Sequence, residues 1–341
     1  MHIEGRACMA EFGLRLADKN ISVKAVYEST AEYCRDYFCA FDAPDLCIEV
    51  TEADIIAERD LDDAERAAEG LLPRTPNFHY LETLALYRKI ASALVEHDTV
   101  LFHGSAVAVD GEVYLFTAKS GTGKSTHTRL WREHFGERAV MVNDDKPLLR
   151  ISDGTVWVYG TPWNGKHRLS TNIRLPLRAL CILERAEKNS VSVADKRESF
   201  PAILGQTYRP SGVLAMQKIL QLVDRLLMSV PLYRLGCNMD PEAAEVAYNG
   251  MRGFGKMKLK NDFITHNSGA EQLMISAGGG FSGMVRSNTT AAAIIDLLKS
   301  EIDRETIVSS MLEKYEVERA VLERDVDRVL ATLREIGALN D

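Results

Sequence analysis

The sequence predicts a mixed α/β protein, with a small α+β segment before the core and a winged-helix-like domain after it. Three observations lead to this fold class. Short strand-like runs and helical runs share the middle of the chain without the regular alternation of a doubly wound sheet. A glycine-rich loop separates a strand-like run from a helical run within residues 112–135. The last part of the chain has three short strand-like runs followed by three amphipathic helical stretches, which is typical of a winged helix.

Composition and charge restrict the class of protein. The chain has 341 residues, of which 46% are hydrophobic and 26% charged, as expected for a globular protein of two or three domains. The formal net charge is −8, which argues against nucleic acid and anionic membranes as partners. No apolar run approaches the ~20 residues of a membrane span, and the N-terminus lacks the apolar core of a signal peptide. The six cysteines show no metal-type spacing, so we expect free thiols and a cytoplasmic location.

Changes of pattern along the chain predict its domain organisation. Residues 77–97 have apolar side chains at helical spacing and follow two strand-like runs, so the first segment is expected to be an accessory α+β unit. A basic, glycine-containing stretch near residue 253 is expected to be a linker. The predicted boundaries are 1–95 for the accessory segment, 96–250 for the core, 251–256 for the linker and 257–341 for the winged-helix-like domain.

Local turn and helix signals support this division. Asp110-Gly111 lies between two strand-like runs, which predicts a two-residue hairpin turn. Asp240 precedes a helical run and is expected to be its N-cap, and Gly250 is expected to end that helix. The core segment is therefore predicted to close at Gly250. Asn288, before an alanine run, and Asp303, followed by Thr306, are expected to begin two later helices.

The stretch AKSGTGKSTH, residues 118–127, indicates a phosphate-binding loop. It differs from the pattern G-x-x-x-x-G-K-[ST] only in having Ala118 at the first glycine position. Two glycines give the loop the backbone freedom to turn its N–H groups inward, and Lys124 would reach the β- and γ-phosphates of ATP. The Ser125 hydroxyl would ligate Mg²⁺. The loop residues predicted to bind the nucleotide are Ser120, Gly121, Thr122, Gly123, Lys124, Ser125 and Thr126. The alternative is a glycine-rich turn with a chance lysine.

Two adjacent carboxylates follow the next apolar run. The stretch AVMVNDDKP places Asp144 and Asp145 at the end of a predicted strand. One acid could hold Mg²⁺, directly or through water, and the other could take a proton from a substrate hydroxyl. The alternative is a solvated turn at the end of a strand.

Two further positions are candidates with an open alternative. His103 precedes the strand that pairs with the loop strand, so it could contact a transferring phosphate or assist proton movement, or it could be a half-buried structural histidine. Lys166, with His167 and Arg168, lies in the loop GTPWNGKHR and could bring positive charge to the γ-phosphate. An ordinary surface turn is the alternative there.

Together these motifs resemble the HPr kinase/phosphorylase and ATP-type phosphoenolpyruvate carboxykinase superfamily, over roughly residues 100–250. The resemblance implies a mixed-sheet P-loop kinase core that uses ATP and Mg²⁺. It implies that Asp144 activates the acceptor hydroxyl, that Asp145 and Ser125 serve the metal, and that His103 matches a histidine upstream of the loop. With the lysine of the loop, the predicted catalytic residues are Asp144, His103 and Lys124.

The stretches GMVRSNTTAAAIIDLLK and TIVSSMLEKYEVERAVLERDVDRVLATLREIGAL, within residues 283–339, resemble the PqqD family. That resemblance implies a domain that binds the leader of a ribosomally made precursor peptide as an added strand. The leading hypothesis is therefore a kinase that phosphorylates a serine or threonine hydroxyl of such a peptide. A small-molecule kinase or carboxykinase-like enzyme, and a non-catalytic adaptor for nucleotide and peptide, remain alternatives. The kinase resemblance also allows a homo-oligomer.

Overall fold

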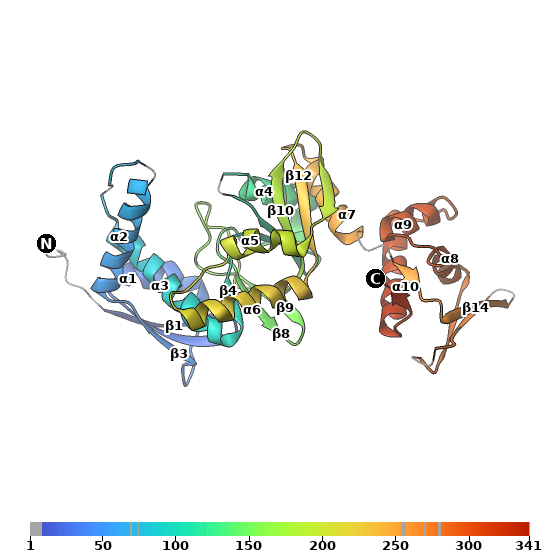
Figure 1. The fold of residues 1–341 in the computed structure, drawn as a ribbon, viewed down its shortest axis with the longest axis horizontal. Helices are drawn as coiled ribbons and strands as arrows, with labels where there is room; N and C mark the ends of the chain where they lie inside the picture. The colour runs from blue at the N-terminus through green and yellow to red at the C-terminus, as the bar shows by residue number, and fades with distance from the viewer. Residues whose placement is uncertain are drawn as a thin grey trace. The chain divides into compact units, whose positions relative to one another are not determined.

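The computed structural model describes residues 9–68, 70–73, 75–119, 121–253, 257–268, 271–278 and 281–340. Ser120 of the predicted loop lies outside the described residues. The chain forms two compact units that divide between Glu245 and Val246, and each is described separately (Figure 1). The predicted boundaries of the accessory segment, core, linker and C-terminal domain stay predictions, because the division into two compact units does not separate the accessory segment from the core.

The first segment builds a three-stranded sheet covered by helices. The sheet order is β1-β2-β3, with β1 and β2 antiparallel and β3 parallel to β2. Ala17 and Asp18 make the β1–β2 turn with φ of 50° and 58°, which is the geometry of a two-residue hairpin. The element bounds are Ala10–Leu16 for β1, Lys19–Ala25 for β2, Glu28–Cys34 for α1, Leu46–Glu49 for β3, Glu52–Ala68 for α2 and Phe78–Leu94 for α3.

A nine-stranded mixed sheet forms the core. Its path runs β4-β8-β9-β10-β6-β5-β7, and β12 pairs with both β10 and β11. Asp110 and Gly111 form the β5–β6 turn with φ of 54° and 82°, so the predicted hairpin is confirmed. The strands are β4 Thr99–Leu101, β5 Ser105–Val109, β6 Glu112–Thr117, β7 Ala139–Asn143, β8 Leu148–Ser152, β9 Thr155–Tyr159, β10 Arg174–Arg185, β11 Ser190–Val193 and β12 Leu232–Cys237.

Helices cover both faces of this sheet because alternate residues of a strand point to opposite sides. Val113 and Leu115 of β6 join the apolar cluster under α6. Tyr114 and Phe116, the alternate residues, contact the ring of Trp131 on α4 with centroid separations of 4.8 and 5.2 Å. The helices are α4 Lys124–Phe135, α5 Lys196–Gln206, α6 Val213–Ser229 and α7 Glu242–Gly253, and the short 3₁₀ turns are Arg35–Tyr37, Val95–His97 and Gly136–Arg138.

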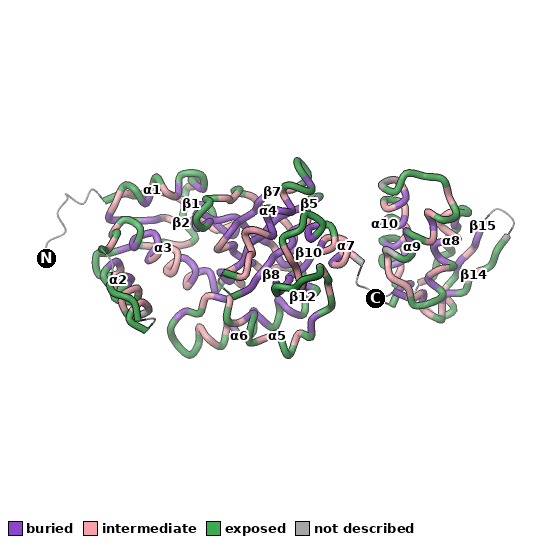
Figure 2. The backbone as a smooth tube through the Cα atoms, turned by 90° about the horizontal axis from the view of Figure 1, so that it is seen from above, coloured by how far each residue is buried: buried purple, intermediate pink, exposed green. Residues whose placement is uncertain are grey.

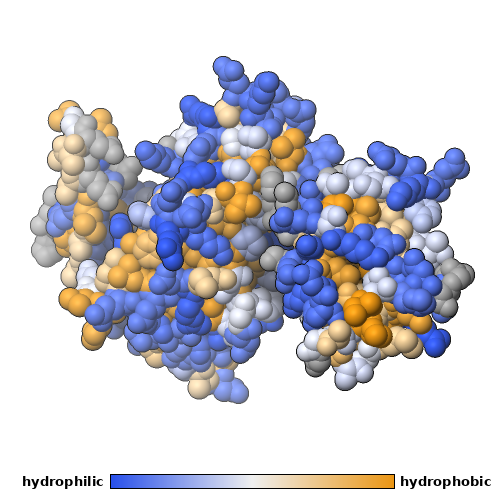
Figure 3. All heavy atoms as spheres, turned by 45° about the vertical axis from the view of Figure 1, so that its right-hand side comes forward, coloured by the Kyte–Doolittle hydropathy of each residue, from blue (hydrophilic) through white to orange (hydrophobic). Residues whose placement is uncertain are grey.

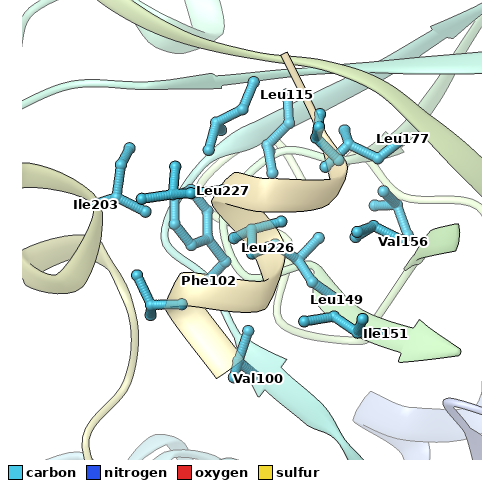
Figure 4. Packing of buried hydrophobic residues seen from close by; sticks show 14 of the residues in the cluster. Val100, Phe102, Leu115, Leu149, Ile151, Val156, Leu177, Ile203, Leu226 and Leu227 are labelled. Carbon is cyan, nitrogen blue, oxygen red and sulfur yellow. The ribbon is translucent and has the colours of Figure 1, made fainter. Parts of the chain in front are cut away.

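The main core lies between α6 and the sheet. Leu226 and Leu227 of α6 pack toward Phe102 and Leu149 (Figure 4). The strands β5, β7, β8 and β10 are largely buried, whereas α5 and α6 alternate buried and exposed residues (Figure 2). A long β10 pairs with β9 in antiparallel fashion at its start and with β6 in parallel fashion further along. It thereby joins the two halves of the sheet.

A second apolar cluster joins the first segment to the core. Leu14 and Ile21 of the small sheet and Leu86 of α3 share this cluster with Tyr159 and Trp163. The Trp163 indole N–H donates to the Thr83 carbonyl oxygen at 2.9 Å. The accessory segment and the core are therefore one packed body.

The C-terminal unit has the predicted three strands followed by three helices. The sheet order is β14-β15-β16, all antiparallel, and a two-stranded ladder of β13 and β17 closes the unit. The Asn288 and Asp303 side chains accept from the Ala291 and Thr306 backbone N–H groups at 2.9 and 2.8 Å, so both predicted helix starts are confirmed. The bounds are β13 Lys258–Leu259, β14 Phe263–Ser268, β15 Glu271–Ser276, β16 Met284–Ser287, α8 Thr289–Leu297, α9 Arg304–Leu312, α10 Arg319–Glu335 and β17 Leu339–Asn340.

One helix end differs from its prediction. Gly250 was expected to stop the helix that begins after Asp240, but α7 continues to Gly253. A single glycine costs only about 1 kcal/mol inside a helix, which tertiary packing of neighbours can offset. Ala247 and Met251, on either side of Gly250, are buried.

Candidate active site

The glycine-rich loop has the backbone conformation that its sequence predicts. β6 ends at Thr117 and α4 begins at Lys124, so the loop leads directly into a helix N-terminus. Gly121 and Gly123 have φ of 77° and 124°, where L side chains are strained, although a Cβ at either position would meet nothing within 4 Å. Backbone conformation, and not lack of space, therefore requires glycine here.

Lys124 lies at the start of α4 and bends back over the loop. Its Nζ donates to the Ala118 carbonyl oxygen at 3.4 Å. Burial lowers the pKa of Lys124, and the charge of Asp145 opposes that effect. A phosphate oxygen could replace this carbonyl oxygen as the partner of the ammonium group, so the position of Lys124 suits a phosphate ligand.

An Asx turn directs the acid pair out of strand β7. The Asn143 side-chain oxygen accepts from the backbone N–H groups of Asp145 and Lys146 at 2.9 and 2.7 Å. The Asn143 amide nitrogen donates to the Thr161 carbonyl oxygen at 3.0 Å. Because the chain turns at this point, both carboxylates line the same cavity instead of opposite faces of a strand.

Asp144 is the buried member of the pair, with 6% of its surface exposed. Ser105 Oγ donates to Asp144 Oδ1 at 2.6 Å and also lies 2.9 Å from the hydroxyl of Thr128. Burial raises the pKa of Asp144, whereas hydrogen bonds from Ser105 and Ser125 lower it. The result is a carboxylate with a raised pKa next to Ser125 of the glycine-rich loop.

Asp145 is about one-third exposed and faces His103. The distance from His103 Nε2 to Asp145 Oδ1 is 3.4 Å, and Lys146 Nζ lies 3.5 Å from the same oxygen. Burial, together with the charges of Lys146 and Lys124, lowers the pKa of His103 to about 4. At neutral pH His103 is therefore a neutral imidazole, and its contact with Asp145 is not a charged pair.

The predicted basic loop lies opposite the acids. Lys166 and His167 are exposed and line the same cavity as Asp144. Backbone hydrogen bonds hold the loop to the strand end, from Asp144 N to Leu169 O at 3.0 Å and from Lys146 N to Trp163 O at 3.2 Å. These two hydrogen bonds connect the loop directly to the acid pair.

The first segment also braces this loop. The Tyr37 hydroxyl donates to Ser170 Oγ at 3.1 Å, and the Asn164 amide donates to the same oxygen at 2.8 Å. The Arg168 guanidinium lies 4.8 Å from the ring centre of Tyr33. No local pattern in the first segment indicates a role at the site, and only the folded chain brings Tyr33 and Tyr37 to the loop.

Most of the predicted site residues share one cavity of about 420 Å³. Thr122 lies instead on a neighbouring cavity, which also touches Gly121. Ser105 and Asn143 were not among the predicted residues, although each lies within two positions of a predicted one. The residues lining the shared cavity are His103, Gly121, Gly123, Lys124, Ser125, Thr126, Asp144, Asp145, Gly165, Lys166 and His167.

The C-terminal unit has a groove of its own. A cavity of about 780 Å³ lies between the end of β16, the start of α8 and the middle of α10. Arg286 and Arg328 contribute positive charge, Glu271 and Asp325 negative charge, and Ile294 an apolar base. In the described sheet, β16 pairs with β15 on one side only, so its other edge has backbone groups available to an added strand.

Apolar side chains also reach the surface of the C-terminal unit (Figure 3). Ile264, Ile275 and Met284 are about half exposed, and the strand register places them in one row across β14, β15 and β16. This row lies on the outward side of the sheet, because the alternate residue Met274 is fully buried.

The chain thus joins an α/β core, which carries a glycine-rich loop and an acid pair at one cavity, to a winged-helix-like unit. Residues 271–339 match the model of the PqqD family, coenzyme PQQ synthesis protein D. The C-terminal domain is PqqD-like, and both the predicted α/β fold class and the predicted PqqD domain are confirmed. No match was found among curated proteins.

Solved structures similar to parts of the chain include two leader-peptide complexes. TbiB1 in complex with the TbiA(beta) leader peptide is 20% identical, with a TM-score of 0.23, and the match covers 24% of this chain and 94% of TbiB1. The lasso peptide synthetase B1 complexed with the leader peptide is 21% identical, with a TM-score of 0.23, over 26% of this chain and 100% of that chain.

A third similar structure is the HPr(Ser) kinase/phosphatase from Coxiella burnetii. It is 12% identical, with a TM-score of 0.25, over 44% of this chain and 94% of that chain. Separately, none of the helices in the described ranges is long and apolar enough to cross a bilayer.

Proposed function

We propose that the protein is an ATP- and Mg²⁺-dependent kinase that phosphorylates a serine or threonine hydroxyl on a precursor peptide held by its PqqD-like domain. The observation that carries the proposal is the convergence of Lys124, Asp144, Asp145 and His103 on one cavity at the mouth of the glycine-rich loop. Nucleotide binding alone requires neither a second carboxylate nor a buried one with a raised pKa.

The residues present fit a magnesium nucleotide. The left-handed φ of Gly121 and Gly123 and the start of α4 suit the phosphates, and Lys124 supplies the positive charge. Ser125 and Asp145 offer the oxygen ligands that Mg²⁺ prefers, and the ion, when bound, neutralises charge on the phosphates.

In the proposed reaction, the acceptor hydroxyl oxygen forms a bond to the γ-phosphorus while the bond from that phosphorus to the β,γ-bridging oxygen breaks. The hydroxyl proton passes to Asp144, and ADP is the leaving group. The raised pKa of Asp144 supports this role, because a general base is most effective when its pKa approaches the working pH. Neutral His103 would donate a hydrogen bond to the transferring phosphoryl group or to Asp145.

The peptide is proposed to bind in the groove of the C-terminal unit, with its backbone added to the free edge of β16. The match of residues 271–339 to the PqqD family supports a peptide as the occupant. Tethering would raise the effective concentration of the acceptor at the core and thereby lower the peptide concentration needed for transfer.

A bulky substitution in the groove tests the tethering. Ala291 lines the groove, whereas Ala331 lies exposed on α10 and does not line it. With the precursor peptide encoded nearest this chain's gene as substrate, Ala291→Trp should raise the KM for peptide about tenfold or more. The same substitution should leave the Kd for ATP unchanged, and Ala331→Trp should behave as wild type. Equal KM values for the two variants would rule out peptide capture by this groove, and a small-molecule acceptor would then be favoured.

A further inference from the structure

A second cavity, of about 800 Å³, lies next to the glycine-rich loop on the side away from the acids. Gly121 lines both cavities, so they meet at the loop. The walls of the second cavity come from the ends of β6 and β10 and from α5. Its volume is within the range of about 300–1,000 Å³ that is usual for small-molecule sites.

Strand directions explain why the two cavities lie on opposite sides of the loop. β7 is antiparallel to β5, which is antiparallel to β6, so β7 and β6 run the same way. β10 and β12 are parallel to β6 on its other side. The carboxyl ends of β7, β6 and β10 therefore reach one edge of the sheet, with the loop between the acid pair and the second cavity.

A nucleoside triphosphate has reacting and non-reacting ends, and these ends need different surroundings. The γ-phosphate must face Asp144, Asp145 and the acceptor, so the rest of the molecule must leave the loop in another direction. The second cavity begins where the loop ends on the β10 side, and it has apolar wall atoms from Ile182, Pro201 and Ala202. This adjoining space has room for a base and a ribose.

The charged groups of this cavity suit the same ligand. The Arg185 guanidinium donates to the Gly121 and Thr122 carbonyl oxygens, at 2.6 Å to the former and 3.3 Å to the latter. It thus holds the loop and places positive charge where the chain of phosphates would leave it. Arg234 pairs with Glu184 on the same wall, and together they offer donors and an acceptor to the polar edge of a base or to ribose hydroxyls.

We propose that this cavity is the nucleoside subsite of the kinase, with Arg185 at the junction of nucleoside and phosphates. The inference rests on the proposed function, because it presumes that the loop binds the phosphates of ATP. The described lining residues include no aromatic side chain. Apolar contact and the Glu184–Arg234 pair, instead of ring stacking, would therefore hold the base.

Filling the cavity from α5 tests the proposal. Gly205 lines it, and a Cβ added there meets nothing within 4 Å. Gly205→Leu would project a side chain into the space for the nucleoside, and Gly205→Ala is the matched control, adding one methyl group. Calorimetry on the full chain with Mg²⁺-ATP and with Mg²⁺-tripolyphosphate separates the nucleoside contribution from the phosphate contribution.

We expect Gly205→Leu to weaken ATP binding about tenfold or more while tripolyphosphate binds as in wild type. Gly205→Ala should change both affinities little. Unchanged ATP binding by Gly205→Leu would overturn the subsite and leave the phosphate loop intact. If wild type binds neither ligand, both the subsite and the proposed function are wrong.

Photolabelling gives a second measurement that does not depend on a variant that folds. 8-Azido-ATP bound to wild-type protein should label peptides from α5 or from the end of β10, at residues 196–206 or 182–185. Labelling of the loop at residues 164–168 would place the base beside the acids instead and would contradict the proposal. Both ATP and tripolyphosphate are expected to compete with the probe, because both ligands would occupy the loop.

Discussion

Ser105 donates a 2.6 Å hydrogen bond to Asp144, linking the first residue of β5 to the turn that follows β7. Ser105 is fully buried, and its hydroxyl also contacts Thr128 on α4. This bond joins the strand next to the loop strand, the helix that follows the loop and the proposed proton acceptor. The position of the carboxylate is therefore set by the same elements that position the glycine-rich loop.

Ser105→Ala should impair transfer without abolishing ATP binding. Loss of this hydrogen bond removes one interaction that lowers the pKa of Asp144, so that pKa should rise further. The acid limb of the pH–rate profile should then move to higher pH. The free energy of unfolding should fall by about 1–3 kcal/mol, because a buried acceptor loses a hydrogen-bond partner. Ser152→Ala, which removes a hydroxyl at the end of β8, is the control and should leave the pH profile in place.

Lys124→Ala should weaken Mg²⁺-ATP binding about 10- to 100-fold, since it removes a charge-assisted hydrogen bond to the phosphates. Lys188→Ala, at an exposed lysine after β10, removes the same charge elsewhere and should have no effect. Calorimetric titration of both variants with Mg²⁺-ATP measures the two Kd values. A Kd equal to that of wild type for Lys124→Ala would exclude the loop as the phosphate site.

Asparagine substitutions at Asp144 and Asp145 should impair the kinase in different ways. Asp144→Asn should reduce transfer about 10²-fold or more while keeping ATP affinity, because it removes the proton acceptor and keeps the shape. Asp145→Asn should instead raise the Mg²⁺ concentration needed for activity. Titration of Mg²⁺ against rate in both variants checks the assignment. The opposite pattern would exchange the two roles, and normal transfer by both variants would remove the acid pair from the mechanism.

Asp144→Asn should also stabilise the protein in the absence of ligand. The folded-state pKa of Asp144 is raised above its ordinary value of 3.8. Ionisation of Asp144 therefore lowers the free energy of unfolding as the pH rises from 3.8 through the folded-state pKa. At neutral pH the wild type carries the cost of a buried charge, which asparagine lacks. The Tm of Asp144→Asn should exceed that of wild type at neutral pH, and the difference should shrink toward pH 4. A lower Tm at neutral pH would contradict the burial argument.

Tyr37→Phe tests whether the first segment supports the site. The substitution keeps the buried ring and removes the hydroxyl that donates to Ser170. We expect kcat to fall severalfold with little change in the Kd for ATP, because Leu169 accepts from the Asp144 backbone N–H and Ser170 forms a β-bridge with Asn143. Tyr208→Phe removes a similar half-buried hydroxyl, one that lies 3.5 Å from Ser92, and should leave kcat unchanged. Equal kcat values for the two variants would reduce the first segment to a stabilising role.

Local sequence signals predicted much of the core. The Asp110-Gly111 turn, the strand–loop–helix around Lys124 and the caps at Asn288 and Asp303 each depend on a few neighbouring residues, so they are readable without knowledge of the fold. The acids were predicted in the same way, as carboxylates after a buried strand.

Features that depend on distant contacts could not be predicted. The β1–β2 turn at Ala17 and Asp18 has no Asn-Gly or Asp-Gly signal, and strand β1 was missed. Tyr37 reaches Ser170 across 133 residues of sequence, a contact that no local pattern encodes. Gly250 was a misleading stop signal, because packing of its neighbours outweighed its low helix propensity.

The most direct measurement of the central claim is phosphopeptide mapping by mass spectrometry. The full-length protein would be incubated with Mg²⁺-ATP and the short peptides encoded beside its gene, with Asp144→Asn in parallel. We expect a phosphate on a serine or threonine of one such peptide with wild-type protein, and about 100-fold less phosphopeptide, or less still, with Asp144→Asn. Binding of both ATP and the peptide without any phosphopeptide would contradict the account and favour an adaptor that binds both without catalysis.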